Sequence, residues 1–265
     1  MLRCNSFSII SMQVYIFNQR IPTYGFCIVI GTILSNLIAL IIIKKKKLDL
    51  NDFILIEAFS LLGAFIGAKA LYLFISFKYI EWNRLSDFNY LNQLMQGGFV
   101  FYGGLIGAFI AGFLACKFYK IKFSNYLNDL IFLVPLAHAF GRIGCFFSGC
   151  CYGVPYSGRF SVIFPENSFA PSGIQLFPVQ LAEAIGLFII SITLVFIKLS
   201  KFNSCGVPLY FILYGLLRIQ IEKYRFDSYR GFFLNLSTSQ WLSIFFITFG
   251  LIMIYMQFHR RKVYG

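Results

Sequence analysis

The stretch Gly141-Arg142-Ile143-Gly144-Cys145-Phe146-Phe147-Ser148-Gly149-Cys150-Cys151-Tyr152-Gly153 places one arginine, three cysteines and four glycines at the end of an apolar segment. An arginine within a membrane-spanning helix is costly to insert, so such a residue is a candidate for a functional site. Glycines let a backbone or a ligand come close. The stretch therefore predicts a spanning helix that carries a site at one end.

The composition around this stretch is typical of a polytopic membrane protein. Of the 265 residues, 58% are hydrophobic and 12% are charged, whereas soluble domains contain about 25% charged residues. The net charge of +13 does not indicate nucleic-acid binding, because the basic residues form no stripe interleaved with stacking aromatic side chains. They stand in short clusters beside apolar runs, as expected of cytoplasmic membrane flanks.

Seven apolar segments approach the length of about 20 residues that a spanning helix needs. Basic clusters follow the first, third, fifth and seventh segments, and an excess of Lys and Arg marks the cytoplasmic side. We therefore predict an all-α membrane helix bundle of about seven transmembrane helices, with the N-terminus outside and the C-terminus cytoplasmic. The segments lie at about 24–43, 53–77, 97–117, 127–147, 179–197, 207–224 and 239–257.

We expect residues 1–265 to form a single integral membrane domain. The longest predicted outer loop, at about 148–178, is rich in Gly, Pro and Ser and predicts an ordered external cap. The pairs Gly63/Gly67 and Gly103/Gly107 have the GxxxG spacing of close helix contacts in lipid. The first twenty residues lack a long apolar stretch, so we expect no signal peptide there.

Two rows of polar side chains lie on single helix faces near the outer ends of their spans. They are His138, Arg142 and Cys145 in the fourth span, and Arg218, Glu222 and Arg225 in the sixth. The positive-inside bias does not explain arginines at that end. Because the planar guanidinium binds phosphate through two hydrogen bonds, the rows predict a site for an anionic lipid headgroup. The alternative is a structural ion pair in which Glu222 neutralises Arg218 or Arg225.

Weaker signals accompany these rows. Tyr102 lies within a glycine-rich run and presents a hydroxyl, although interfacial tyrosines are commonly aromatic-belt residues. Residues 177–183 combine a proline-initiated helix start with two polar side chains, which a simple cap also accounts for. The seven cysteines are odd in number and contain no CxxC pair, so we expect neither a disulfide framework nor a metal site, and no cofactor.

Taken in order, these motifs resemble those of the prolipoprotein diacylglyceryl transferase family. The resemblance runs from about residue 24 to residue 255. It rests on Tyr24-Gly25, Gly67-Ala68-Lys69, Tyr102-Gly103-Gly104-Leu105, the stretch 141–153, the motif 178–183, the row Arg218, Glu222 and Arg225, and Ser239-Gln240. It implies a seven-span enzyme of the bacterial plasma (inner) membrane. Such an enzyme moves diacylglycerol from phosphatidylglycerol to the lipobox cysteine of a prolipoprotein signal peptide.

The resemblance implies roles for particular residues. Arg142, Arg218 and Tyr102 are expected to be catalytic from this resemblance, and His138 from its own chemistry. The residues expected to bind substrate are Arg142, Tyr24, Gly103, Gly104, Glu222 and Arg225. His138 suits proton transfer better than Tyr102, because the reference pKa of tyrosine, about 10, is far above neutral pH.

This chain also departs from the family pattern. Tyr102 stands where the family has histidine and Lys69 where it has arginine. Cys145 and Ser148 replace two asparagines, and Cys150 replaces a glutamate. Two interpretations follow: an active transferase with a changed site, or a relative that binds anionic phospholipid and has a thiol or redox role without transferase activity.

Overall fold

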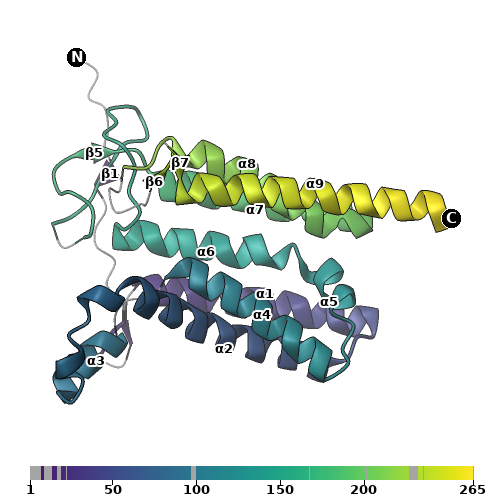
Figure 1. The fold of residues 1–265 in the computed structure, drawn as a ribbon. Helices are drawn as coiled ribbons and strands as arrows, with labels where there is room; N and C mark the ends of the chain where they lie inside the picture. The colour runs from purple at the N-terminus through teal and green to yellow at the C-terminus, as the bar shows by residue number, and fades with distance from the viewer. Residues whose placement is uncertain are drawn as a thin grey trace. The chain divides into compact units, whose positions relative to one another are not determined.

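The computed structural model describes residues 7–8, 14–16, 19–21, 23–96, 100–166, 168–200, 202–226, 232–234 and 236–264. Most of them are helical, which confirms the predicted all-α class (Figure 1). The α-helices are α1 (Thr23–Lys46), α2 (Leu50–Ile75), α3 (Phe88–Gln96), α4 (Phe101–Phe118), α5 (Phe123–Leu130), α6 (Leu133–Ser148), α7 (Val179–Leu199), α8 (Gly206–Glu222) and α9 (Thr238–Tyr264). Short 3-10 helices lie at Phe77–Tyr79, Trp82–Arg84 and Asn203–Cys205.

The strands contain two or three residues each. They are β1 (Phe7–Ser8), β2 (Val14–Ile16), β3 (Gln19–Ile21), β4 (Val162–Ile163), β5 (Gln175–Leu176), β6 (Phe232–Phe233) and β7 (Leu236–Ser237). Strand β4 pairs with β1 in parallel and with β5 in antiparallel orientation, and β2–β3 and β6–β7 are antiparallel pairs. The expectation about a signal peptide falls largely on residues outside the described part of the chain.

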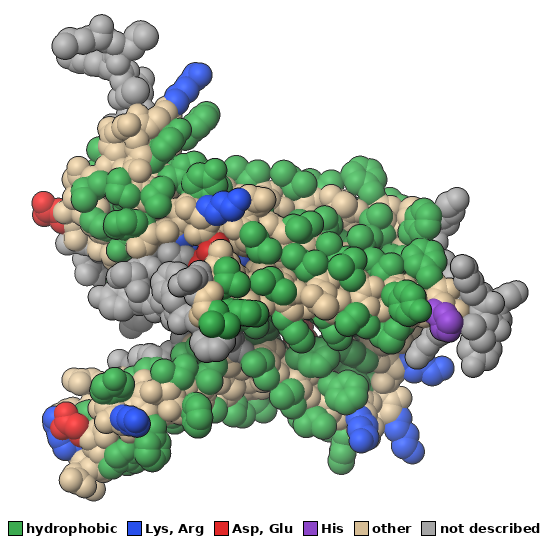
Figure 2. Space-filling model, turned by 45° about the horizontal axis from the view of Figure 1, so that its top comes forward, with side chains coloured by type: hydrophobic (Ala, Val, Ile, Leu, Met, Phe, Trp, Pro, Cys, Tyr) green, Lys and Arg blue, Asp and Glu red, His purple; other side chains and the backbone are tan. Residues whose placement is uncertain are grey.

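Every predicted span coincides with helical structure. Helices α1, α2, α7 and the Thr238–His259 part of α9 are each long and apolar enough to cross a membrane. The surface visible in Figure 2 is largely covered by hydrophobic side chains, as lipid contact requires. The chain is therefore a multi-pass membrane protein. The count of seven crossings stays a prediction, because α4 and α8 are shorter than these helices. The orientation of the crossings also stays a prediction.

The fourth predicted span is a broken helix rather than a continuous one. Helices α5 and α6 meet at a bend of 56° and are long and apolar enough for a span only together. Pro135 lies in the first turn of α6. It has no N–H to donate to the carbonyl of Ile131, and its ring collides with that carbonyl in a continuous helix. The proline therefore ends α5 and is tolerated at the start of α6.

The chain divides into two compact units, one of which comprises residues 43–126. Its helices α2 and α4 approach through glycines: a Cβ added to Gly63 or Gly67 collides with a backbone carbonyl of Gly107 or Gly103. This confirms the packing role predicted from the GxxxG spacing.

The buried Lys69 of α2 donates to the carbonyls of Leu94 and Met95, the latter at 3.4 Å, and so attaches the end of α3 to α2.

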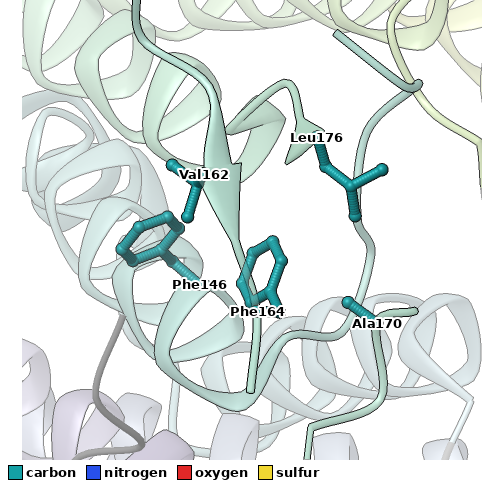
Figure 3. Packing of buried hydrophobic residues seen from close by; sticks show 5 residues of the cluster. All are labelled: Phe146, Val162, Phe164, Ala170 and Leu176. Carbon is teal, nitrogen blue, oxygen red and sulfur yellow. The ribbon is translucent and has the colours of Figure 1, made fainter. Parts of the chain in front are cut away.

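The other unit comprises residues 1–42 and 127–265. Within it α7 packs against both α6 and α8, and α8 packs against α9. The segment after α6 is attached by a small apolar core. Figure 3 shows its side chains converging from the end of α6, from β4 and β5 and from the loop between these strands. They are Phe146, Val162, Phe164, Ala170 and Leu176. The single domain and the external position of this cap stay predictions.

Gly107→Ala is expected to lower the thermal unfolding midpoint, because its new methyl group collides with the Gly63 carbonyl. Overpacking of this kind costs roughly 1–3 kcal/mol. Gly25→Ala is the matched control, since it adds the same methyl to a helix where nothing lies within 4 Å. Equal unfolding midpoints for both variants would contradict the close approach of α2 and α4.

Candidate functional site

A buried carboxylate at the start of α7 joins two arginines from neighbouring helices. Oε2 of Glu183 lies 3.2 Å from Nε of Arg142 on α6 and 3.5 Å from Nη1 of Arg218 on α8. The Glu183 side chain is only 3% exposed. Its other oxygen, Oε1, has no hydrogen-bond partner among the described residues. One carboxylate therefore lies between two guanidinium groups and neutralises part of their charge.

Arg218 is held by three partners. Besides Glu183, its Nη2 lies 3.0 Å from Oε2 of Glu222, one helical turn along α8, and donates to Oγ of Ser239 on α9 at 3.0 Å. Ser243 in turn donates to the carbonyl of Ser239 at 2.8 Å. The network thus links α6, α7, α8 and α9. The ion pair considered for Glu222 is present, and its predicted contact with substrate stays a prediction.

His138 lies one turn before Arg142 on α6. Its ring meets Tyr214 of α8 in an edge-on arrangement, with ring centroids 5.5 Å apart. Tyr214 belongs to an apolar cluster with Ala139 and Leu187. His138 is therefore positioned by aromatic packing, on the same side of α6 as the arginine network.

The cysteines of the opening stretch converge at the end of α6. The Sγ atoms of Cys145, Cys150 and Cys151 lie within 4.8 Å of one another. The Cys150 thiol also donates to the carbonyl of Cys145 at 3.7 Å. Tyr24, at the start of α1, is near enough to interact electrostatically with these thiols. Gly144 allows this approach, because a side chain at this position would place its Cβ only 3.1 Å from the Cα of Tyr24.

Two polar connections tie the cap to these helices. The buried Gln180 of α7 donates through Nε2 to the carbonyl of Cys150 at 2.8 Å. Arg225, just beyond α8, forms an isolated β-bridge with Gly153. The cap therefore begins between α7 and the end of α8, and Arg225 lies at its base.

The remaining predicted site residues belong to the 43–126 unit. The side chain of Tyr102 lies outside the part that the structure describes. Gly103 and Gly104 face α2: a Cβ added to Gly104 would lie 3.2 Å from the carbonyl oxygen of Ala64. Both glycines thus have a packing role, and contact of these three residues with lipid stays a prediction.

A profile of the prolipoprotein diacylglyceryl transferase family matches residues 11–256. The chain belongs to this family. A relative from Clostridium tetani is 35% identical over 249 residues, which is 93% of this chain and 97% of the relative. A relative from Clostridium perfringens is 32% identical over 242 residues, 90% of this chain and 91% of the relative. Both are named phosphatidylglycerol–prolipoprotein diacylglyceryl transferase, the second with the number 2.

In this member of the diacylglyceryl transferase family, sequence reasoning did not assign Glu183 or Gln180 to the site. The signal was present in the motif 178–183, where two polar side chains enter an apolar helix. A helix cap accounted for it equally well. The contacts that distinguish a cap from a site come from α6 and α8, and the spacing within α7 contains no information about those helices.

Glu183→Gln should destabilise the protein, because an amide cannot neutralise the two guanidinium groups. Removing one partner from a buried ion pair costs about 3–5 kcal/mol. Glu81→Gln is a suitable control: Glu81 pairs with Arg84 at 3.1 Å, but both side chains are more than half exposed. We expect a clear fall in the thermal unfolding midpoint only for Glu183→Gln. Similar midpoints for both variants would show that the network contributes little to stability.

Proposed function

We propose that this protein transfers the diacylglyceryl group of phosphatidylglycerol to the thiol of a prolipoprotein lipobox cysteine. The observation that carries the proposal is the linked pair Arg142 and Arg218, held by Glu183 across three apolar helices. Such a pair matches an anionic phospholipid headgroup. Relatives at 31–35% identity over at least nine tenths of this chain bear the name of this transferase.

The reaction exchanges one bond to carbon for another. The lipobox thiol loses its proton, its sulfur forms a bond to the terminal glycerol carbon of the diacylglyceryl group, and the bond from that carbon to phosphate oxygen breaks. Glycerol phosphate leaves with the electron pair of that bond. Negative charge therefore grows on the phosphate as the bond breaks, and fixed positive groups beside it stabilise the transition state.

The geometry suggests different tasks for the two arginines. Glu183 contacts Nε of Arg142, so we assign the two terminal nitrogens of that guanidinium to the phosphate. Arg218 is engaged by Glu183, Glu222 and Ser239, which hold its charge in place. Arg225, at the base of the cap, and Tyr24, at the start of α1 near the end of α6, are assigned to the outer part of the headgroup.

We assign removal of the thiol proton to His138. The thiolate is the nucleophilic form of cysteine, and imidazole is the side chain whose ordinary pKa lies nearest neutral pH. His138 lies one turn from Arg142 and is packed in place by Tyr214. No cofactor takes part in this proposed reaction. Because these proposed substrates meet in the bacterial plasma (inner) membrane, we assign the protein to that membrane.

Purified protein in bilayers that contain phosphatidylglycerol should add a diacylglyceryl group to a synthetic lipobox peptide. Mass spectrometry of the peptide measures the product, and a peptide with serine in place of the lipobox cysteine is the negative control. The absence of product, in conditions where a related transferase is active, would exclude the proposed reaction and favour the phospholipid-binding alternative.

Arg142→Ala should reduce transfer by at least about 100-fold, the usual effect of losing one preorganised charge-stabilising donor. Arg142→Lys keeps the charge without the planar fork, so we expect intermediate activity. Cys151→Ser should retain activity within about twofold of the parent, because no step of the proposed reaction uses this thiol. Initial rates in the same peptide assay test all three variants. Loss of activity in Cys151→Ser alone would instead support the thiol function.

A further inference from the structure

The three thiols at the end of α6 form a second constellation that the proposed transfer does not use. Cys145 is buried in the last turn of α6, and Cys150 and Cys151 are half-buried beyond the helix. All three Sγ atoms lie within 4.8 Å of one another. Among the described His, Cys, Asp and Glu residues, these three cysteines form the group whose ligand atoms lie close enough together to share a metal ion.

The backbone after α6 is bent so that the thiols converge. Gly149 ends the helix with a φ of 72°, and Cys151 has a φ of 57°. Left-handed backbone is easy for glycine but unfavourable for a residue with a Cβ. Two such residues within three positions turn the chain back on the helix end. The hydrogen bond from Gln180 to the Cys150 carbonyl, at 2.8 Å, holds this turn.

The sulfur separations suit a thiolate-bound metal ion. With metal–sulfur bonds of about 2.3 Å, neighbouring sulfurs around one ion lie about 3.8–4.0 Å apart. The observed limit of 4.8 Å exceeds this by about 1 Å. Small side-chain rotations close such a gap, so the backbone already places the three sulfurs for a common ligand.

The surrounding charge favours the thiolate form that metals require. The positive charges of Arg225 and Arg142 lie near enough to Cys151 to interact electrostatically with its sulfur. The same arginines offset the negative charge that accumulates when three thiols deprotonate. This part of the protein can therefore hold several thiolates close together.

We propose that Cys145, Cys150 and Cys151 form a binding site for one thiophilic metal ion, Zn²⁺ or Cu⁺. Thiolate ligands select these ions over the harder Mg²⁺ and Ca²⁺. Binding of Zn²⁺ forms three Zn–S bonds, releases three thiol protons to water and leaves the fourth tetrahedral position to a water molecule. Cu⁺ is satisfied by the three sulfurs alone. No electron transfer is involved.

A disulfide is the competing use of these residues. It would join two of the three sulfurs, need an external oxidant and bring the paired atoms to about 2.05 Å. Cys145, Cys150 and Cys151 are all free thiols in the structure. A disulfide would leave the third thiol without a role, whereas one metal ion accounts for the convergence of all three.

The test measures zinc on the full-length protein in detergent, reduced with a phosphine and dialysed against micromolar Zn²⁺. Elemental analysis should find about one more zinc ion per chain in the parent than in the Cys145→Ser/Cys150→Ser/Cys151→Ser variant. Cys116→Ser/Cys205→Ser is the matched control, because it removes two buried thiols outside the cluster. This control should bind as much zinc as the parent. Neither lipid nor peptide is needed, so the result is independent of the transferase reaction.

Three outcomes distinguish a built metal site from adventitious binding and from a disulfide. Equal zinc on the parent and the triple variant, with Cu⁺ likewise equal on both, would mean adventitious binding and overturn the proposal. A disulfide would be identified instead by two results together. The reduced parent would bind neither zinc nor Cu⁺, and before reduction the peptide that contains Cys150 would be lighter by the mass of two hydrogen atoms. Should the triple variant fail to fold, Cys150→Ser alone must weaken zinc binding by about tenfold or more in competition with a chromogenic chelator. Unchanged affinity in that variant would equally overturn the proposal.

Discussion

The arrangement of the helices that carry the site depends on the carboxylate of Glu183. Two guanidinium groups enter a region of low dielectric constant from α6 and α8, where their mutual repulsion is weakly screened. Glu183 lies between them, at 3.2 Å from Arg142 and 3.5 Å from Arg218. Glu222 and Ser239 complete the surroundings of Arg218, and the last of these belongs to α9. Removing the carboxylate leaves two buried positive charges without their shared partner, which a packed apolar interior does not accommodate.

The two units use different physics to associate their helices. In lipid, helices gain no hydrophobic driving force from contact with one another, so close packing and polar contacts must hold them together. Helices α2 and α4 rely on packing, because the glycines Gly63 and Gly107 let their backbones meet. The helices around Arg218 rely on ion pairs and hydrogen bonds. The second arrangement leaves charged groups in the bundle, and a charged substrate can use them.

Three of the departures implied by the family resemblance, Cys145, Ser148 and Cys150, lie at or just beyond the end of α6, beside this network rather than within it. Arg142, Glu183 and Arg218 are present and linked, whereas Cys145 and Cys150 stand where the resemblance to the family implies asparagine and glutamate. In place of amide and carboxylate oxygens, the end of α6 therefore presents sulfur, which is a softer ligand. Headgroup binding through arginine and metal binding through thiolate are chemically separate, so one protein can have both properties.

The sequence by itself determined the helical membrane class, the approximate position of each helix and the two polar rows, because hydropathy and the period of 3.6 residues are local properties. It also predicted a close helix contact from the spacing of Gly63 and Gly67, but not that α4 is the partner helix. It did not predict the break at Ile131, where Pro135 outweighs an uninterrupted apolar pattern. Only the tertiary structure decided that Glu183 joins Arg142 to Arg218 and that three cysteines meet beyond α6. Such contacts depend on which helix faces become neighbours and on how a turn directs the chain, and no spacing within a single helix contains that information.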